Sequence, residues 1–145
     1  MFVSKSFEII FKRKHLKKWQ IVFWLNAALL LYLTLMPSVH HNVSYQNIDK
    51  LFHFVGFGAF AFFCVLAFPR LAFFWTITIS FSMGIGVEVA QSFLPYRGFS
   101  YADMFADFAG IIAAVGFLWI GKGILLRQAQ VTSSEESLCS GAREI

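Results

Sequence analysis

Four long apolar runs constrain the fold of this chain more than any other feature. They cover residues 19–36, 51–68, 71–93 and 104–120. A helix of about 20 mostly apolar residues crosses the hydrocarbon core of a bilayer. The composition supports this interpretation, since 58% of the residues are hydrophobic, 19% are aromatic and only 14% are charged. We therefore predict an all-α integral membrane protein, a bundle of four transmembrane helices.

The prolines fall where such helices should end. Pro37, Pro69 and Pro95 each lie just beyond one of the first three runs. Proline can follow a helix there without breaking one of its internal hydrogen bonds. The first run lies behind a basic segment, as in a signal peptide, but it is long and no small-residue cleavage site follows it. We expect an uncleaved anchor.

The basic residues predict the orientation of the bundle. One side carries Lys5, Lys12, Arg13, Lys14, Lys17, Lys18, Arg70, Lys122 and Arg127, whereas the other side has only Lys50 and Arg97. Loops rich in Lys and Arg stay in the cytoplasm. Both termini are therefore predicted to be cytoplasmic. The net charge of +4 follows from this topology, so no nucleic-acid partner is expected.

The chain divides into three predicted parts. Residues 1–18 form a basic cytoplasmic segment, and residues 19–120 form the four-helix domain. Residues 121–145 form a cytoplasmic tail that is rich in Ser and Glu and is expected to be disordered. Cys64 lies inside the second run and Cys139 in the tail, so we expect two free thiols.

Ionisable side chains interrupt three of the runs near their outer ends. An ionisable group at mid-bilayer costs about 2.5 to 3.5 kcal/mol on insertion scales, so such groups usually turn inward and pair. The residues come in pairs at helical spacing: Asp49 with His53, Glu88 with Gln91, and Asp103 with Asp107. Gly56, Gly84 and Gly110 would leave room between the helices. We expect one outward-opening polar pocket among the second, third and fourth spans.

The charge of this predicted pocket does not balance. Its acidic residues are Asp49, Glu88, Asp103 and Asp107, against which stand Lys50 and Arg97. The excess negative charge favours a protonated carboxyl, with Glu88 the deepest candidate, a protonated His53, or a bound cation. In a purely structural alternative, ion pairs such as Asp103 with Arg97 or Lys50 with Glu88 clamp the outer helix ends.

The same residues carry a resemblance to a known family. The order and spacing of Asp49-Lys50, His53-Phe54, Glu88, Gln91, Pro95, Arg97, Ser100, Asp103 and Gly110 resemble the VanZ-like family of small bacterial membrane proteins. The resemblance covers about residues 20–120. It departs at Asp107, a position that is commonly Asn in the family. It implies a setting in the bacterial cytoplasmic membrane and a link to resistance against the glycopeptide teicoplanin.

The leading hypothesis is a site that binds or modifies a membrane lipid or a lipid-linked envelope precursor. Arg97 and Lys50 would hold a phosphate or a carboxylate, because Arg offers a planar fork of donors and Lys a point charge. The candidate acids and bases are His53, Glu88 and Asp103. The remaining candidate ligand-binding residues are Asp49, Gln91, Ser100 and Asp107.

Two hypotheses of other classes remain open. One is a non-catalytic accessory protein that docks a membrane-protein partner or a second copy of itself. The other is proton-coupled transport, which the sequence favours less because no ionisable residue continues the path toward the cytoplasm. No cofactor or resident metal is expected. Magnesium held by Asp103 and Asp107, four residues apart, is a weaker variant of the leading hypothesis.

Overall fold

The described structure consists of four helices. The computed structural model describes residues 13–36, 43–95 and 97–141. The helices are α2 (Arg13–Leu35), α3 (Val43–Ala67), α4 (Phe73–Ser92) and α5 (Tyr101–Gly141), and no strand occurs within these residues. The predicted all-α class is therefore confirmed.

Each helix contains a segment that is long and apolar enough to cross a membrane. These segments are His15–Leu35, Ile48–Ala67, Phe73–Ser92 and Tyr101–Ile124. They coincide with the four apolar runs, and so confirm the predicted number of spans. Pro69 and Pro95 follow the ends of α3 and α4 as expected. Pro37 lies outside the described residues.

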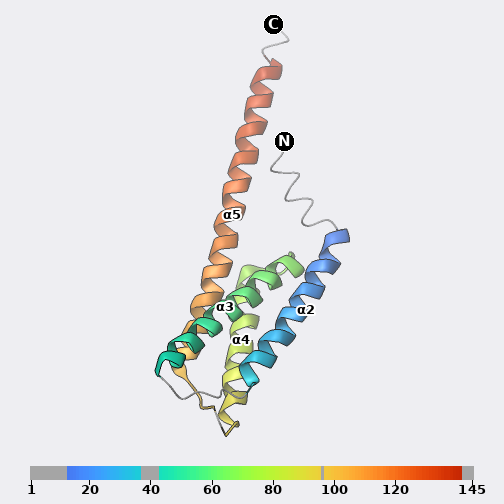
Figure 1. Cartoon of the computed structure of the whole chain (residues 1–145). Helices are drawn as coiled ribbons and strands as arrows, with labels where there is room; N and C mark the ends of the chain where they lie inside the picture. Colours follow the sequence, from blue (N-terminus) through green and yellow to red (C-terminus); the bar gives the residue numbers. More distant parts are fainter. Residues whose placement is uncertain (1–12, 37–42, 96, 142–145) are drawn as a thin grey trace.

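The helices form an elongated bundle in which α3 is the most central element. Its most extensive contact is with α5, and it also packs against α2. The helix α4 returns along the bundle and contacts both α3 and α5. The first residues of α2 and the last of α5 lie toward the same end of the bundle (Figure 1). Which side of the membrane this end faces stays a prediction.

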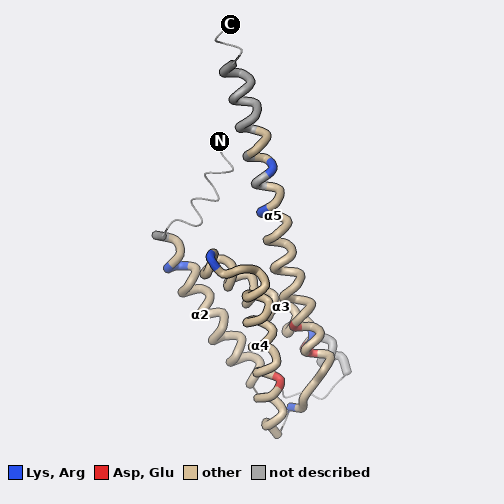
Figure 2. The backbone as a smooth tube through the Cα atoms, turned by 180° about the vertical axis from the view of Figure 1, so that it is seen from behind, with Lys and Arg blue, Asp and Glu red and all other residues tan. Residues whose placement is uncertain are grey.

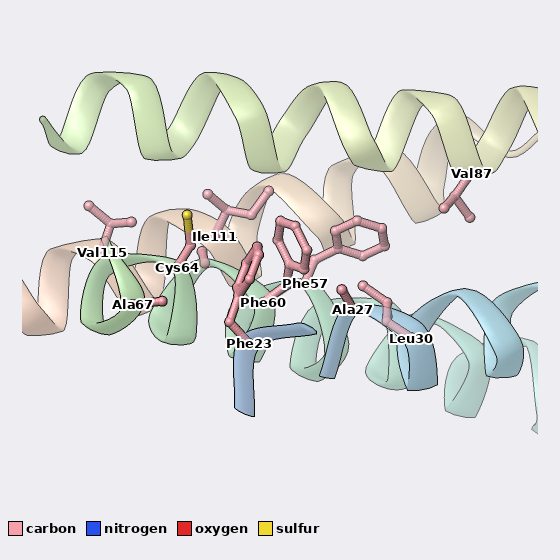
Figure 3. Close-up of a cluster of buried hydrophobic side chains, with 11 residues drawn as sticks. Phe23, Ala27, Leu30, Phe57, Phe60, Cys64, Ala67, Val87, Ile111 and Val115 are labelled. Carbon is pink, nitrogen blue, oxygen red and sulfur yellow. The ribbon is translucent and has the colours of Figure 1, made fainter. Parts of the chain in front are cut away.

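Aromatic and small side chains fill the core between the helices (Figure 3). The ring centroid of Phe23 in α2 lies 5.0 Å from the ring centroid of Phe60 in α3 and 5.4 Å from that of Phe68. Phe57 is fully buried beside them. Cys64 is buried in the same core as a free thiol, as predicted. The side chain of Cys139 lies outside the described residues.

Glycine lets α3 and α5 approach each other at backbone distance. A Cβ at Gly110 would overlap the carbonyl oxygen of Phe54, and a Cβ at Gly58 would lie 3.1 Å from the carbonyl oxygen of Gly110. Small residues at helix contacts are typical of membrane bundles, where dispersion replaces the hydrophobic drive. Gly56 leaves room in another direction, since its Cβ would lie 2.7 Å from the side chain of Leu30 in α2.

Two boundaries differ from those expected. The helix α3 begins at Val43, so Asp49 and Lys50 lie within a helix and not in the loop before it. The helix α5 continues to Gly141, so residues 121–141 are helical where a disordered tail is expected. This segment contains no proline and extends a helix that is already formed, which costs less than starting a new one.

Candidate functional site

The polar cluster that the sequence predicts gathers at one end of the bundle. The acidic residues whose side chains the structure describes are Asp49, Glu88, Asp103 and Asp107, and they lie at the end of the bundle away from the first residues of α2 (Figure 2). Lys50 and Arg97 lie at this same end. The structure thus gathers the predicted polar residues from α3, α4, α5 and the segment before α5.

The most deeply buried contact joins α3 to α5. His53 Nδ1 lies 2.9 Å from Asp107 Oδ1, and the two side chains are only 2% and 0% exposed. With its proton on Nδ1, His53 donates to the carboxylate, which fixes the orientation of the ring. The other oxygen of Asp107 has no hydrogen-bond partner among the described residues and faces α4, where a Cβ at Gly84 would lie 2.8 Å from it.

Glu88 on α4 is the second fully buried carboxyl. Its Oε2 accepts a hydrogen bond of 2.8 Å from the backbone N–H of Ser100. Its Oε1 is buried and has no hydrogen-bond partner in the described structure. The Ser100 N–H lies at the start of α5, where the helix dipole favours a negative charge. One oxygen of Glu88 is therefore fixed, and the other remains able to accept or share a proton.

Ser100 serves α5 as its N-terminal cap. Its Oγ accepts a hydrogen bond of 3.3 Å from the N–H of Asp103, and its carbonyl oxygen accepts from the N–H groups of Asp103 and Met104. Serine is among the preferred residues at this position because its hydroxyl satisfies an orphan donor of the first turn. The Ser100 hydroxyl, which the sequence suggested as a ligand-binding group, thus bonds to the Asp103 N–H in this structure.

Two ion pairs lie around the buried groups. Arg97 Nη1 contacts both carboxylate oxygens of Asp49, at 2.9 and 3.2 Å. Lys50 Nζ lies 3.5 Å from Asp103 Oδ1. The structural alternative gave Asp103 with Arg97 and Lys50 with Glu88 as examples of such pairs, whereas here Arg97 pairs with Asp49 and Lys50 with Asp103. Arg97 also has a buried Nε without a hydrogen-bond partner among the described residues.

Gln91 connects α4 to α2. Its Nε2 donates a hydrogen bond of 2.7 Å to the carbonyl oxygen of Thr34, and the side chain is almost fully buried. Carbonyl groups in the last turn of a helix lack partners within that helix. Gln91 therefore satisfies the end of α2. Sequence reasoning missed Thr34, because a backbone acceptor leaves no mark in a residue pattern.

The cavity at this end lies between α2 and α3. It has a volume of about 410 Å³, and its walls come from α2, the residue after it, α3 and Arg97. The polar residues that line it are Asn26, Thr34, Asp49, His53 and Arg97. The helices α4 and α5 contribute none of the residues that line this cavity, so it is not the pocket expected among the second, third and fourth spans, which stays a prediction. The polar Asn26, inside the first apolar run, was the signal that could have indicated α2.

The sequence matches a family model over nearly the whole bundle. The VanZ/LLP1 model matches residues 2–125, which include every residue of the polar cluster. The chain belongs to the VanZ/LLP1 family. Neither the curated proteins nor the solved structures contain a match to this chain. VanZ/LLP1 membership and four apolar helices fit a membrane protein of the cell envelope.

One group of side chains in this VanZ/LLP1 protein has the composition of a metal site. Asp49, His53 and Asp103 each offer a ligand atom, and these atoms lie within 4.8 Å of one another. Arg97 and Lys50 already pair with the two carboxylates, and their positive charges oppose a divalent cation at the same place. Asp107, which the sequence suggested as a partner of Asp103 for magnesium, is bonded to His53 instead.

The VanZ/LLP1 chain also buries two hydroxyl groups that sequence reasoning missed. Thr76 and Ser80 are fully buried on α4, and the side-chain oxygen of Ser80 has no hydrogen-bond partner in the described structure. They share the buried face of α4 with Gly84 and Glu88 at four-residue spacing. Their spacing matches that of the polar pairs, but without a charge they read as ordinary helix residues in the sequence.

Proposed function

We propose that this VanZ/LLP1 protein binds an anionic lipid or a lipid-linked envelope precursor in the cavity between α2 and α3. The observation that carries the proposal is the combination of an apolar cavity wall with a polar end that contains Arg97. Leu29, Leu33, Phe52 and Val55 line the cavity along the two helices, and Arg97 lies at its polar end. This distribution suits an amphiphile with a hydrocarbon chain and a charged head group.

Arg97 is the anchor for the head group. Its guanidinium contacts Asp49 through Nη1 alone, so the fork of donors is not fully used by that carboxylate. A phosphate can accept two parallel hydrogen bonds from a guanidinium. Lys50 adds a second positive charge, and its side chain is 39% exposed. A phosphate at this end would compete with the carboxylates of Asp49 and Asp103 for Arg97 and Lys50.

His53 is positioned to exchange a proton with such a ligand. The imidazole lines the cavity, and Asp107 holds its Nδ1 from the side of α5. An imidazole fixed by a carboxylate through one nitrogen presents its other nitrogen as an acid or base. This arrangement supports binding followed by modification of the head group, at the face that the basic residues predict to be outside the bacterial cytoplasmic membrane.

Mass spectrometry of membrane lipids and lipid-linked cell-wall precursors tests the proposal in cells. Cells that express wild type are compared with cells that express Glu88→Gln at matched abundance. Glutamine keeps an oxygen for the Ser100 N–H and removes the charge, so folding should be retained. We expect a lipid-linked species whose level changes only with wild type. Because the resemblance implies a link to teicoplanin, susceptibility to this glycopeptide should change with the same variant.

Identical lipid and precursor profiles for wild type, Glu88→Gln and cells lacking the protein would contradict a modifying role. The immunoblot abundance of each variant in the membrane fraction is the control for folding. A profile that changes equally with wild type and Glu88→Gln would also contradict the role of the Glu88 charge. In that case a non-catalytic accessory function would explain the site better.

A further inference from the structure

A second and larger cavity lies at the opposite end of the bundle. It has a volume of about 710 Å³ and lies among α2, α3, α5 and the turn that leads into α4. Most of its lining is apolar, with Trp19 from α2, Phe62 from α3 and Leu118 from α5. None of the residues that line the first cavity lines this one. It is therefore a separate feature of the fold.

The charge at this cavity is positive. Arg70 and Lys122 are the charged residues that line it. Both are exposed, so each can reach a ligand without losing a buried partner. Asp49, Glu88, Asp103 and Asp107 lie at the other end of the bundle (Figure 2). An anion that enters this cavity therefore meets two cations, and none of the described residues that line the cavity is acidic.

The two basic residues lie at the level of a lipid head group. Arg70 lies in the turn after α3, which ends at Ala67. Lys122 lies two residues before Ile124, the last residue of the apolar segment of α5. Both are therefore at the boundary of the hydrocarbon region, where the phosphates of a bilayer lie. Basic pockets between membrane helices at this depth bind anionic lipid head groups.

We propose that this cavity binds one anionic phospholipid, with its phosphodiester between Arg70 and Lys122 and its acyl chains along the apolar wall. Two observations favour a phospholipid as the ligand. The positive charge of Arg70 and Lys122 is complementary to a phosphate, and the apolar lining lies on the membrane side of these two residues. The proposal concerns the basic end of the bundle only. It does not depend on the function proposed for the cavity between α2 and α3.

The chain offers a matched pair of glycines for the test. Gly121 lines the cavity, whereas Gly123 on the same helix does not. A Cβ at either position would meet nothing within 4 Å. Gly121→Leu should therefore fill the cavity without displacing α5, and Gly123→Leu should add the same side chain on another face. Arg70→Gln with Lys122→Gln removes the charge and keeps most of the side-chain volume.

The experiment is native mass spectrometry of the full chain in detergent, titrated with phosphatidylglycerol or with phosphatidylcholine. Wild type and Gly123→Leu should bind one phosphatidylglycerol in preference to phosphatidylcholine. The double glutamine variant should bind phosphatidylglycerol on the order of 30-fold more weakly, from the attraction of two basic residues for an anionic lipid. Gly121→Leu should weaken binding of both lipids.

Three outcomes would overturn the proposal. They are equal affinity of wild type for the two lipids, unchanged phosphatidylglycerol binding by the double glutamine variant, and equal loss of binding in Gly121→Leu and Gly123→Leu. Circular dichroism and the unfolding temperature without added lipid verify the fold of each variant. If the double variant is unfolded, the comparison between the two leucine variants decides the result.

Discussion

Gly110→Ala is expected to destabilise the bundle by about 3 kcal/mol or more, at the upper end of the range for overpacked sites. The added Cβ would overlap the carbonyl oxygen of Phe54 and lie 2.9 Å from its carbonyl carbon. Both atoms belong to a helix backbone and cannot rotate away. The helices α3 and α5 would have to separate, and this is the most extensive helix contact in the described structure.

Gly116→Ala is the matched control for this prediction. It lies on the same helix, and a Cβ there would meet nothing within 4 Å. It should leave the free energy of unfolding unchanged or raise it by up to about 1 kcal/mol, because alanine favours the helix over glycine. Unfolding of purified protein in mixed micelles, titrated with dodecyl sulfate, measures both variants. Equal stability of the two variants would show that α3 and α5 do not touch at Gly110.

His53→Ala and Asp107→Ala are each expected to cost about 3 to 5 kcal/mol of unfolding free energy, as found when one partner of a buried charged pair is removed. Each substitution leaves the other polar group buried without its contact of 2.9 Å. The double variant should cost less than the sum of the two single variants. A double-mutant cycle in the same micelle assay measures this coupling.

Asp107→Asn separates the hydrogen bond from the charge in this pair. Asparagine keeps an oxygen that can accept from His53 Nδ1–H, and the resemblance to VanZ-like proteins implies that asparagine is common at this position. We expect Asp107→Asn to cost much less than Asp107→Ala. Additive effects in the cycle, or equal losses for asparagine and alanine, would contradict the pairing of His53 with Asp107.

The four spans could be predicted from the sequence because bilayer thickness sets the length of an apolar helix. The ends of the helices were less well predicted. The helix α3 begins at Val43, ahead of the apolar run, because polar residues outside the membrane can extend a helix that the apolar run has started. The same reason accounts for the extension of α5 to Gly141.

The convergence of the polar residues at one end could also be predicted, because residue number gives depth along each helix. The partners of each group could not. Depth does not determine how a helix is rotated about its axis, so the sequence could not show whether Asp49 or Asp103 faces Arg97, which contacts Asp49. The part of α2 in the cavity was missed for a related reason: Asn26 and Thr34 carry no charge, and their role depends on the neighbouring helix.

Identification of the lipids that remain bound to the purified protein tests the central claim most directly. Lipids extracted from wild type are compared with those from Arg97→Gln, which loses the head-group anchor, and Ala59→Phe, which fills the cavity between α2 and α3. Ala28→Phe is the control, because Ala28 is exposed on α2 and does not line the cavity. We predict a phosphate-bearing lipid that stays with wild type and Ala28→Phe and is lost from the other two variants, whereas a phospholipid held at Arg70 and Lys122 stays with all four. Equal retention of every bound lipid by all four proteins, or no bound lipid in wild type, would contradict the claim.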